Sequence, residues 1–321
     1  MFGAFRFSLA AMVVYNHLIN PTFAGPVAVF GFYCLSGYLM TRVINETYAD
    51  GAPGFLRYIA NRALRLYPTY YAALALAIAA DLLWPVTAAS LLHRVALPSA
   101  LLPDLTILVM QSRFELLLPQ TWSLNVEILH YILIGALLGR SRRATVLWFV
   151  CAALIPSLAI LFVRPPVEWL YFSAPATSIA FATGAMIWHF HNRLNGIGPW
   201  LGLAAACVFI LAGLVMPEHI GLRGGLFAAL PIGALAVGGL KNLPPKSWDS
   251  YLGDLAYPAF LLHIPAAIFA RSLLDDQQEW ILSITFTMGA SWLALVFIEK
   301  PLQVFRATLR HRPLSASMPA A

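Results

Sequence analysis

The feature that most constrains this chain is a series of long segments with almost no charged residues, such as residues 146–163 and 201–216. A helix needs about 20 predominantly apolar residues to cross the hydrocarbon core of a bilayer. Charged residues make up only 11% of the chain, against about 25% in soluble domains. In lipid every backbone polar group must be satisfied within the chain, so such segments form helices and not open sheets. The sequence therefore predicts an all-α, multi-pass membrane protein.

Ten segments are predicted to cross the membrane, and an even number places both termini on the same side. With the N-terminus in the cytoplasm, most of the Lys and Arg residues between the spans lie on the cytoplasmic side, as the positive-inside rule requires. We therefore expect both termini to be cytoplasmic. The stretch 85–120 is predicted to be re-entrant or interfacial on the outer side. The predicted spans are residues 4–20, 25–44, 67–84, 122–139, 144–163, 171–190, 200–217, 223–240, 250–271 and 281–298.

The predicted domain organisation is simple. Residues 1–305 are expected to form one transmembrane domain, and residues 306–321 a disordered cytoplasmic tail. We expect no fused soluble domain. The three cysteines have the spacing of neither a metal site nor a disulfide framework, so no metal cofactor is expected.

The first predicted helix carries two ionisable residues, Arg6 and His17. Ionisable side chains are costly inside a membrane, so each is a candidate functional residue. Eleven helical positions correspond to about three turns and about 16 Å. Both side chains therefore share one face, with Arg6 near the cytoplasmic end and His17 near the outer end. The alternative is that Arg6 reaches back to the inner interface and His17 caps the helix end near water.

The fourth predicted helix begins near Trp122, Ser123 and Asn125 and carries Glu127. If this helix enters from the outer side, Glu127 lies at about the depth of His17. A carboxylate that accepts a hydrogen bond from an imidazole orients the ring and raises its basicity. We therefore expect Glu127 to orient His17. The alternative is a structural pair between Glu127 and an arginine or another histidine.

Small residues mark the second predicted helix, where Gly31, Ser36 and Gly37 occur close together. Small side chains let neighbouring membrane helices approach closely. We interpret these residues as packing positions, with substrate contact as the alternative.

Arg62 and Arg65 precede the third predicted span and share one face of what is predicted to be a short amphipathic helix. Pro68 is expected to separate that helix from the span. Guanidinium groups bind phosphate oxygens through two hydrogen bonds at once, so the pair suits a phosphorylated ligand at the cytoplasmic mouth. Attraction to anionic lipid headgroups is the alternative.

His263 lies near the middle of the ninth predicted span, between Pro258 and Pro265. Proline leaves a helical carbonyl without its usual donor, and a histidine bonded to such a carbonyl has a structural role. A catalytic role is the other interpretation.

Together these residues resemble the membrane acyltransferase-3 family, whose members include bacterial O-acetyltransferases of surface polysaccharides and oligosaccharides. The resemblance extends from Arg6 to Pro301. Its motifs are Arg6 and His17 separated by ten residues, followed by residues 32–38, 62–70, 122–127, 261–265 and 299–301.

The resemblance implies an enzyme of the bacterial inner membrane with acetyl-CoA, or another acyl-CoA, as cytoplasmic donor. It implies a carbohydrate or glycolipid acceptor at the outer face, no nucleic-acid partner and a possible homodimer. The site residues it implies are the catalytic His17, Glu127 and Arg6; the donor-binding Arg62, Arg65, Tyr70 and again Arg6; and the substrate-contacting or structural Ser36, Trp122, Ser123, Asn125 and His263.

The predicted mechanism keeps the nucleotide of the donor at Arg62 and Arg65 and threads its thioester through the bundle towards His17. His17 then acts as general base on the acceptor hydroxyl, or it carries the acyl group covalently. Two other functions stay open. One is a transporter or flippase for a glycan or lipid precursor, in which Arg6, His17 and Glu127 line the pathway. The other is a sensor or assembly factor without turnover.

Overall fold

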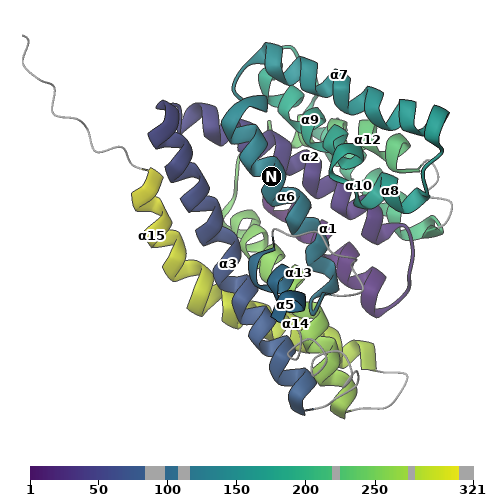
Figure 1. The fold of residues 1–321 in the computed structure, drawn as a ribbon, viewed down its shortest axis with the longest axis vertical. Coiled ribbons are helices and arrows are strands. Elements are labelled where there is room, and N and C mark those ends of the chain that lie inside the picture. Colours follow the sequence, from purple (N-terminus) through teal and green to yellow (C-terminus); the bar gives the residue numbers. More distant parts are fainter. Residues whose placement is uncertain (84–97, 108–115, 219–224, 274–278, 311–321) are drawn as a thin grey trace, which may run out of the picture.

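The computed structural model describes residues 1–83, 98–107, 116–218, 225–273 and 279–310. Within these ranges every regular element is a helix and there is no strand, which confirms the all-α prediction (Figure 1). The α-helices are α1 (Phe2–Leu18), α2 (Ala24–Glu46), α3 (Gly51–Leu83), α5 (Pro98–Thr106), α6 (Trp122–Leu133), α7 (Arg142–Leu158), α8 (Val167–Phe172), α9 (Ala174–His189), α10 (Pro199–Val215), α12 (Leu226–Leu240), α13 (Ser247–Leu273), α14 (Glu279–Ala294) and α15 (Lys300–Arg310). A 3-10 turn, η2 (Pro119–Thr121), precedes α6, and π-helical turns η3 (Ile134–Leu138), η4 (Ala159–Val163) and η6 (Leu295–Glu299) extend α6, α7 and α14.

Six helical stretches of the described ranges are long and apolar enough to cross a membrane. They are Ala24–Glu46, Gly51–Ala80, Pro119–Leu138, Arg142–Val163, Ser247–Leu273 and Glu279–Arg310, and the shorter apolar helices α10 and α12 accompany them. A helix lies in each of the ten predicted segments. The number of spans and the side on which the termini lie stay predictions.

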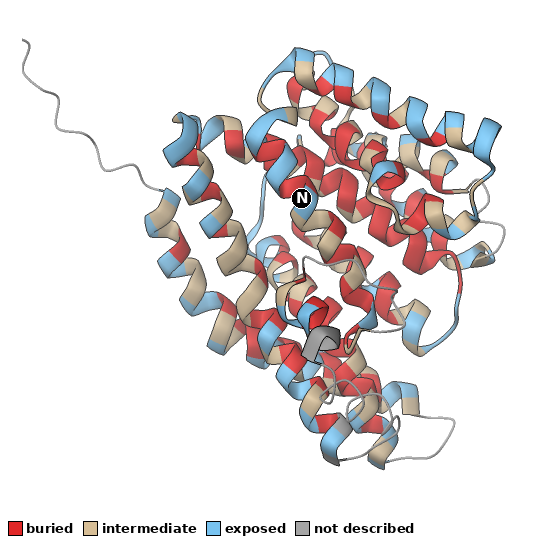
Figure 2. Cartoon of the chain, viewed as in Figure 1, coloured by how far each residue is buried: buried red, intermediate tan, exposed pale blue. Residues whose placement is uncertain are grey.

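The centre of the bundle is α2, which packs against α1, α9, α10 and α12 and is largely buried (Figure 2). Two glycines allow α2 and α9 to touch. A Cβ on Gly37 would lie 2.0 Å from the carbonyl oxygen of Phe181, and one on Gly184 would lie 1.9 Å from that of Cys34. This close approach is the packing role predicted for Gly37.

The outer helix α7 shows the opposite pattern. Leu147, Leu154 and Leu158 project from it with high exposure, and its exposed side forms an edge of the bundle in Figure 2. Exposed apolar side chains in such number suit contact with lipid and not with water.

The structure corrects the expectation of a short helix before the third span. Arg62 and Arg65 lie on α3, which continues through Pro68. Proline removes one backbone donor, but a membrane helix tolerates this where neighbouring groups satisfy the freed carbonyl. The hydroxyls of Tyr67, Tyr70 and Tyr71 bond α3 to backbone carbonyls of α5. Within the predicted segment 85–120, the structure describes only residues 98–107, which include α5, and residues 116–120.

At the C-terminal end, α14, η6 and α15 form one continuous arm. The π turn η6 ends two residues before Pro301, which has no N–H to donate to the preceding turn. The arm brings α15 beside α3 (Figure 1). The predicted domain boundary at residue 305 is therefore wrong as a structural boundary, because the helix continues to Arg310. Residues 311–321 lie outside the described residues.

Candidate functional site

A cavity of about 570 Å³ opens between α1, α2, α3, α6, α13 and α15. We call it the main cavity. Its wall carries five arginines from three helices, namely Arg6, Arg62, Arg65, Arg306 and Arg310. The acidic side chains in the same wall are Glu127 and Asp254. Positive charge therefore exceeds negative charge in the wall.

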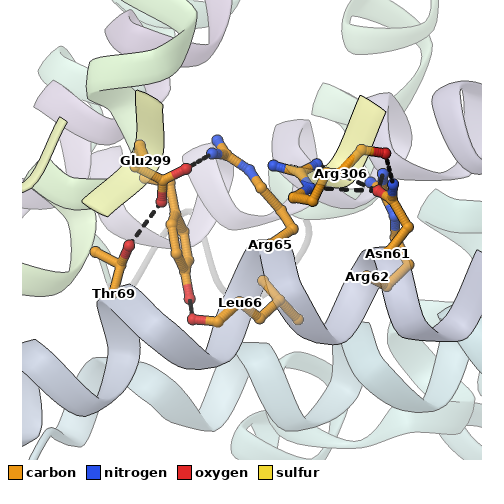
Figure 3. A network of polar contacts seen from close by, with 8 residues as sticks. Asn61, Arg62, Arg65, Leu66, Thr69, Glu299 and Arg306 are labelled. Carbon is orange, nitrogen blue, oxygen red and sulfur yellow. Dashed lines mark hydrogen bonds and ion pairs between the residues drawn. The ribbon is translucent and has the colours of Figure 1, made fainter. Parts of the chain in front are cut away.

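Arg65 has its own counterion. Its guanidinium forms an ion pair with Glu299 of η6, whose carboxylate also accepts a hydrogen bond from the Thr69 hydroxyl at 2.7 Å. The guanidinium carbon lies 5.3 Å from the centre of the Tyr257 ring. Figure 3 shows how these groups join α3 to the C-terminal arm. Arg65 was predicted to bind a phosphorylated ligand, but its charge is already balanced within the protein.

Arg62 and Arg306 have only neutral partners among the described residues. Arg62 Nη2 donates to the Asn61 side-chain oxygen at 2.9 Å and Nη1 contacts the sulfur of Met40 at 3.6 Å. Arg306 Nε and Nη2 donate to the same Asn61 oxygen at 3.3 and 3.4 Å (Figure 3). Arg62 Nε is buried and makes no hydrogen bond within the described residues. The amide of Asn61 thus holds two arginines together without balancing their charge.

Glu127 lies in the wall of the main cavity and not beside His17. Its Oε1 accepts hydrogen bonds from the Ser36 and Tyr131 hydroxyls, each at 2.5 Å. The reason is helical rise. Trp122, the first residue of α6, borders the second cavity described below. Glu127 follows it by five residues, which is about 7.5 Å along the axis. The structure therefore places Glu127 and His17 at different cavities, which does not agree with the prediction that Glu127 orients His17. Ser36 has its bond to Glu127 besides the packing role predicted for it.

His17 borders a second, smaller cavity of about 50 Å³, which we call the His17 pocket. Its wall also includes Asn16, Gln120, Trp122 and Glu218. His17 occupies the last turn of α1 and is exposed. One helix thus carries Arg6 into the main cavity and His17 into the pocket, as its spacing predicted.

The ring of His17 is bonded to the ring of His263. The distance from His17 Nδ1 to His263 Nε2 is 2.8 Å, and the rings are nearly parallel, at an interplanar angle of 9°. His263 Nδ1 lies 2.8 Å from the Phe260 carbonyl oxygen. His263 is fully buried. His263 thus bonds to a backbone carbonyl, as expected, but to that of Phe260 and not to one freed by a proline; the bond to His17 was not predicted.

Two side chains, Val29 and Phe260, line both cavities. They therefore form the partition between the main cavity and the His17 pocket. The shortest path from the main cavity to His17 suggested by this shared lining runs past these two side chains.

The other predicted site residues are divided between the two cavities and the scaffold. Trp122 lines the pocket and packs against Tyr171 at 4.9 Å between ring centres. Ser123 lines the main cavity. Asn125 donates to the Ile107 carbonyl at 2.7 Å. Tyr70 is bonded to the Asp104 carbonyl and is not among the residues that line the main cavity, so its position gives its predicted role in donor binding no support.

Several residues of the site were missed in the sequence. Arg306 and Arg310 are four residues apart on a strongly amphipathic helix, a periodicity that could have been recognised. Asn61 precedes Arg62 and gave no separate signal. Gln120 donates from Nε2 to the Leu261 carbonyl at 3.0 Å and so fixes the start of α6 on α13. In the described part of the chain, no cluster of three or more His, Cys, Asp or Glu side chains is arranged to hold a metal ion.

Comparison with protein families gives one finding. A family model described as an acyltransferase domain matches residues 2–298. The comparisons with curated proteins and with solved structures give no match.

Proposed function

The chain belongs to the acyltransferase-3 family, and we propose that this multi-pass membrane acyltransferase moves an acyl group, namely acetyl, from cytoplasmic acyl-CoA to a carbohydrate hydroxyl at the outer face of a bacterial inner membrane. The donor occupies the main cavity. The acceptor hydroxyl occupies the His17 pocket.

The observation that carries the proposal is the unbalanced charge of the main cavity. Burying a charge is costly unless an opposite charge accompanies it. Arg306 is buried and Arg6 and Arg62 are partly buried, and none of the three forms an ion pair within the described residues, whereas Arg65 does. Arg310 beside them is exposed. A ligand that brings several negative charges supplies the missing counterions, and the phosphates of CoA are such a ligand. Arginine suits them because its planar fork makes two hydrogen bonds to one phosphate.

The chemistry takes place at the far end of α1. An imidazole that removes the proton of the acceptor hydroxyl makes its oxygen a nucleophile and contributes about 10²–10⁴-fold to the rate. The oxygen attacks the thioester carbonyl, a C–O bond forms and the C–S bond breaks. The proton on His17 then passes to the departing thiolate of CoA.

The length of α1 fits a site that binds the nucleotide at one end and carries out the transfer at the other. Arg6 and His17 are separated by about 16 Å along the helix, which is on the scale of the pantetheine arm. The nucleotide therefore stays among the arginines while the thioester reaches His17 between Val29 and Phe260.

The proposal is tested with purified protein in lipid nanodiscs, radiolabelled acetyl-CoA and envelope glycans from cells that lack the protein. We expect acetyl transfer by the unchanged protein and its loss in His17→Ala, with CoA binding retained. His191→Ala, which lies outside both cavities, is the matched control and should transfer normally. Near-normal transfer by His17→Ala would remove His17 from the mechanism. Movement of a glycan across the membrane without any CoA-dependent product would favour the transporter.

A further inference from the structure

The hydrogen bonds of His263 determine where its proton lies. A backbone carbonyl oxygen only accepts hydrogen bonds, so the contact between His263 Nδ1 and the Phe260 carbonyl requires the proton on Nδ1. His263 is fully buried, and its ring nitrogens face a backbone carbonyl and another imidazole. Burying an imidazolium there would be costly. Neutral His263 therefore presents a lone pair on Nε2.

This assignment also determines the proton of His17. The atoms His17 Nδ1 and His263 Nε2 are 2.8 Å apart, and one of them must donate. Since His263 Nε2 carries the lone pair, His17 Nδ1 carries the proton. In neutral His17 the lone pair then belongs to Nε2.

We propose that His263 is a positioning residue that holds His17 in the tautomer with a basic Nε2. This inference rests on the proposed role of His17 as general base. It assigns to a neutral histidine the position that a carboxylate has in many catalytic pairs, and that Glu127 was expected to have. His263 acts through His17 and touches neither donor nor acceptor.

The surroundings of His263 hold it in place. Its helix contains Pro265, which has no N–H to donate to the carbonyl of Leu261. That carbonyl instead accepts the hydrogen bond from Gln120, at 3.0 Å. The turn of α13 that carries His263 is therefore fixed to the start of α6, beside the His17 pocket.

The hydrogen bond between His17 and His263 also affects how stable the charged form of His17 is. When the acceptor proton arrives at Nε2, His17 becomes an imidazolium whose Nδ1 still donates to His263. The acceptor of that bond is a neutral nitrogen, so it stabilises the cation less than a carboxylate would. The proton is correspondingly easier to pass on to the thiolate of CoA.

Two substitutions of His263 separate its hydrogen bond from its size. In His263→Gln, the amide oxygen can accept from His17 Nδ1 at about the position of the imidazole Nε2. His263→Phe fills the space and accepts nothing. We expect His263→Gln to keep kcat within about 10-fold and His263→Phe to lower it by about 10²-fold, the upper end for loss of an orienting partner, while KM for the donor is unchanged.

The decisive measurement is the tautomer itself, read by solid-state ¹⁵N NMR of histidine-labelled protein in nanodiscs, with His17→Ala assigning the signal. We expect the proton on Nδ1 in the unchanged protein and in His263→Gln, and a mixture of tautomers in His263→Phe. The same tautomer and the same rate in His263→Phe would overturn the proposal, as would a changed tautomer in His263→Gln. The NMR result does not depend on turnover, so an absence of acetyl transfer by the unchanged protein refutes the proposed function alone.

Discussion

Replacing Arg62 and Arg65 one at a time by glutamine tests the charge balance of the main cavity. The two arginines are three residues apart on α3 and line the same cavity. Arg62 has neutral partners, whereas Arg65 is paired with Glu299. The two substitutions should therefore have different effects on ligand binding and on stability.

The expected magnitudes follow from these partners. A hydrogen bond to a charged group contributes about 1.5–3 kcal/mol, so Arg62→Gln should weaken CoA binding by about 10- to 100-fold. It removes a charge that has no counterion, so thermal stability without ligand should not fall. Arg65→Gln leaves the carboxylate of Glu299, whose side chain is 2% exposed, without its cation. This should lower the free energy of unfolding by about 3–5 kcal/mol.

The assay combines two measurements on protein in nanodiscs. CoA binding is measured by isothermal titration calorimetry, with pantetheine as the ligand that lacks phosphates. Thermal unfolding is followed by the fluorescence of the nine tryptophans. Arg42→Gln is the matched control, because Arg42 pairs with Glu46 outside the cavity and half of its side chain is exposed. Its effect on either measurement should be small.

Two results would refute this reasoning. One is unchanged CoA affinity in Arg62→Gln, which would show that the charge excess does not serve the donor phosphates. The other is an equal loss of thermal stability in Arg62→Gln and Arg65→Gln, which would show that both arginines have counterions. Pantetheine lacks phosphates, so the two variants should bind it with the same affinity. A difference in their affinity for pantetheine would contradict the inference that the charge excess binds the donor phosphates.

Two further predictions concern the partition and the helix packing. Val29→Trp should narrow the passage between the cavities and lower acyl transfer by about 10²-fold, with CoA affinity unchanged. Transfer at the normal rate would mean that the thioester does not pass between Val29 and Phe260. Gly37→Ala should destabilise the protein by about 1–3 kcal/mol, because its Cβ would overlap the Phe181 carbonyl. Gly289→Ala, where a Cβ meets no heavy atom within 4 Å, is the control for thermal unfolding, and equal effects of the two would contradict the packing argument.

The sequence predicted the parts of the structure that depend on local pattern. Long apolar segments predicted the all-helical fold, and the spacing of Arg6 and His17 predicted that the two side chains lie near opposite ends of one helix. Gly37 was recognised as a packing residue from its size alone. In each case the information lies within a few helical turns.

The residues that pair across the bundle could not be predicted in this way. His263, which bonds to His17, is 246 residues away in the sequence, and the depth of Glu127 in the bundle could not be read from its position in α6 alone. Arg65 was treated like Arg62, since the two are equivalent by spacing. Only the fold shows that Glu299 reaches one of them and not the other. Similarly, Arg306 was assigned to a tail because nothing in residues 300–310 shows that this helix lies against α3.

The side chain of Asn61 has a consequence for how the protein can evolve. It is completely buried, and its one amide oxygen accepts hydrogen bonds from both Arg62 and Arg306. An aspartate would balance the guanidinium groups that the amide leaves unbalanced, at the loss of the hydrogen bond that Asn61 Nδ2 donates to the Arg306 carbonyl oxygen at 3.1 Å. The ligand-free protein would gain stability where the new ion pairs outweigh that lost bond, but the site would attract an anion less strongly. Selection for stability of the ligand-free protein and selection for catalytic turnover therefore oppose each other at this position. An anionic ligand bound at this site would supply the counterion that Asn61 does not, and would stabilise the folded protein on binding.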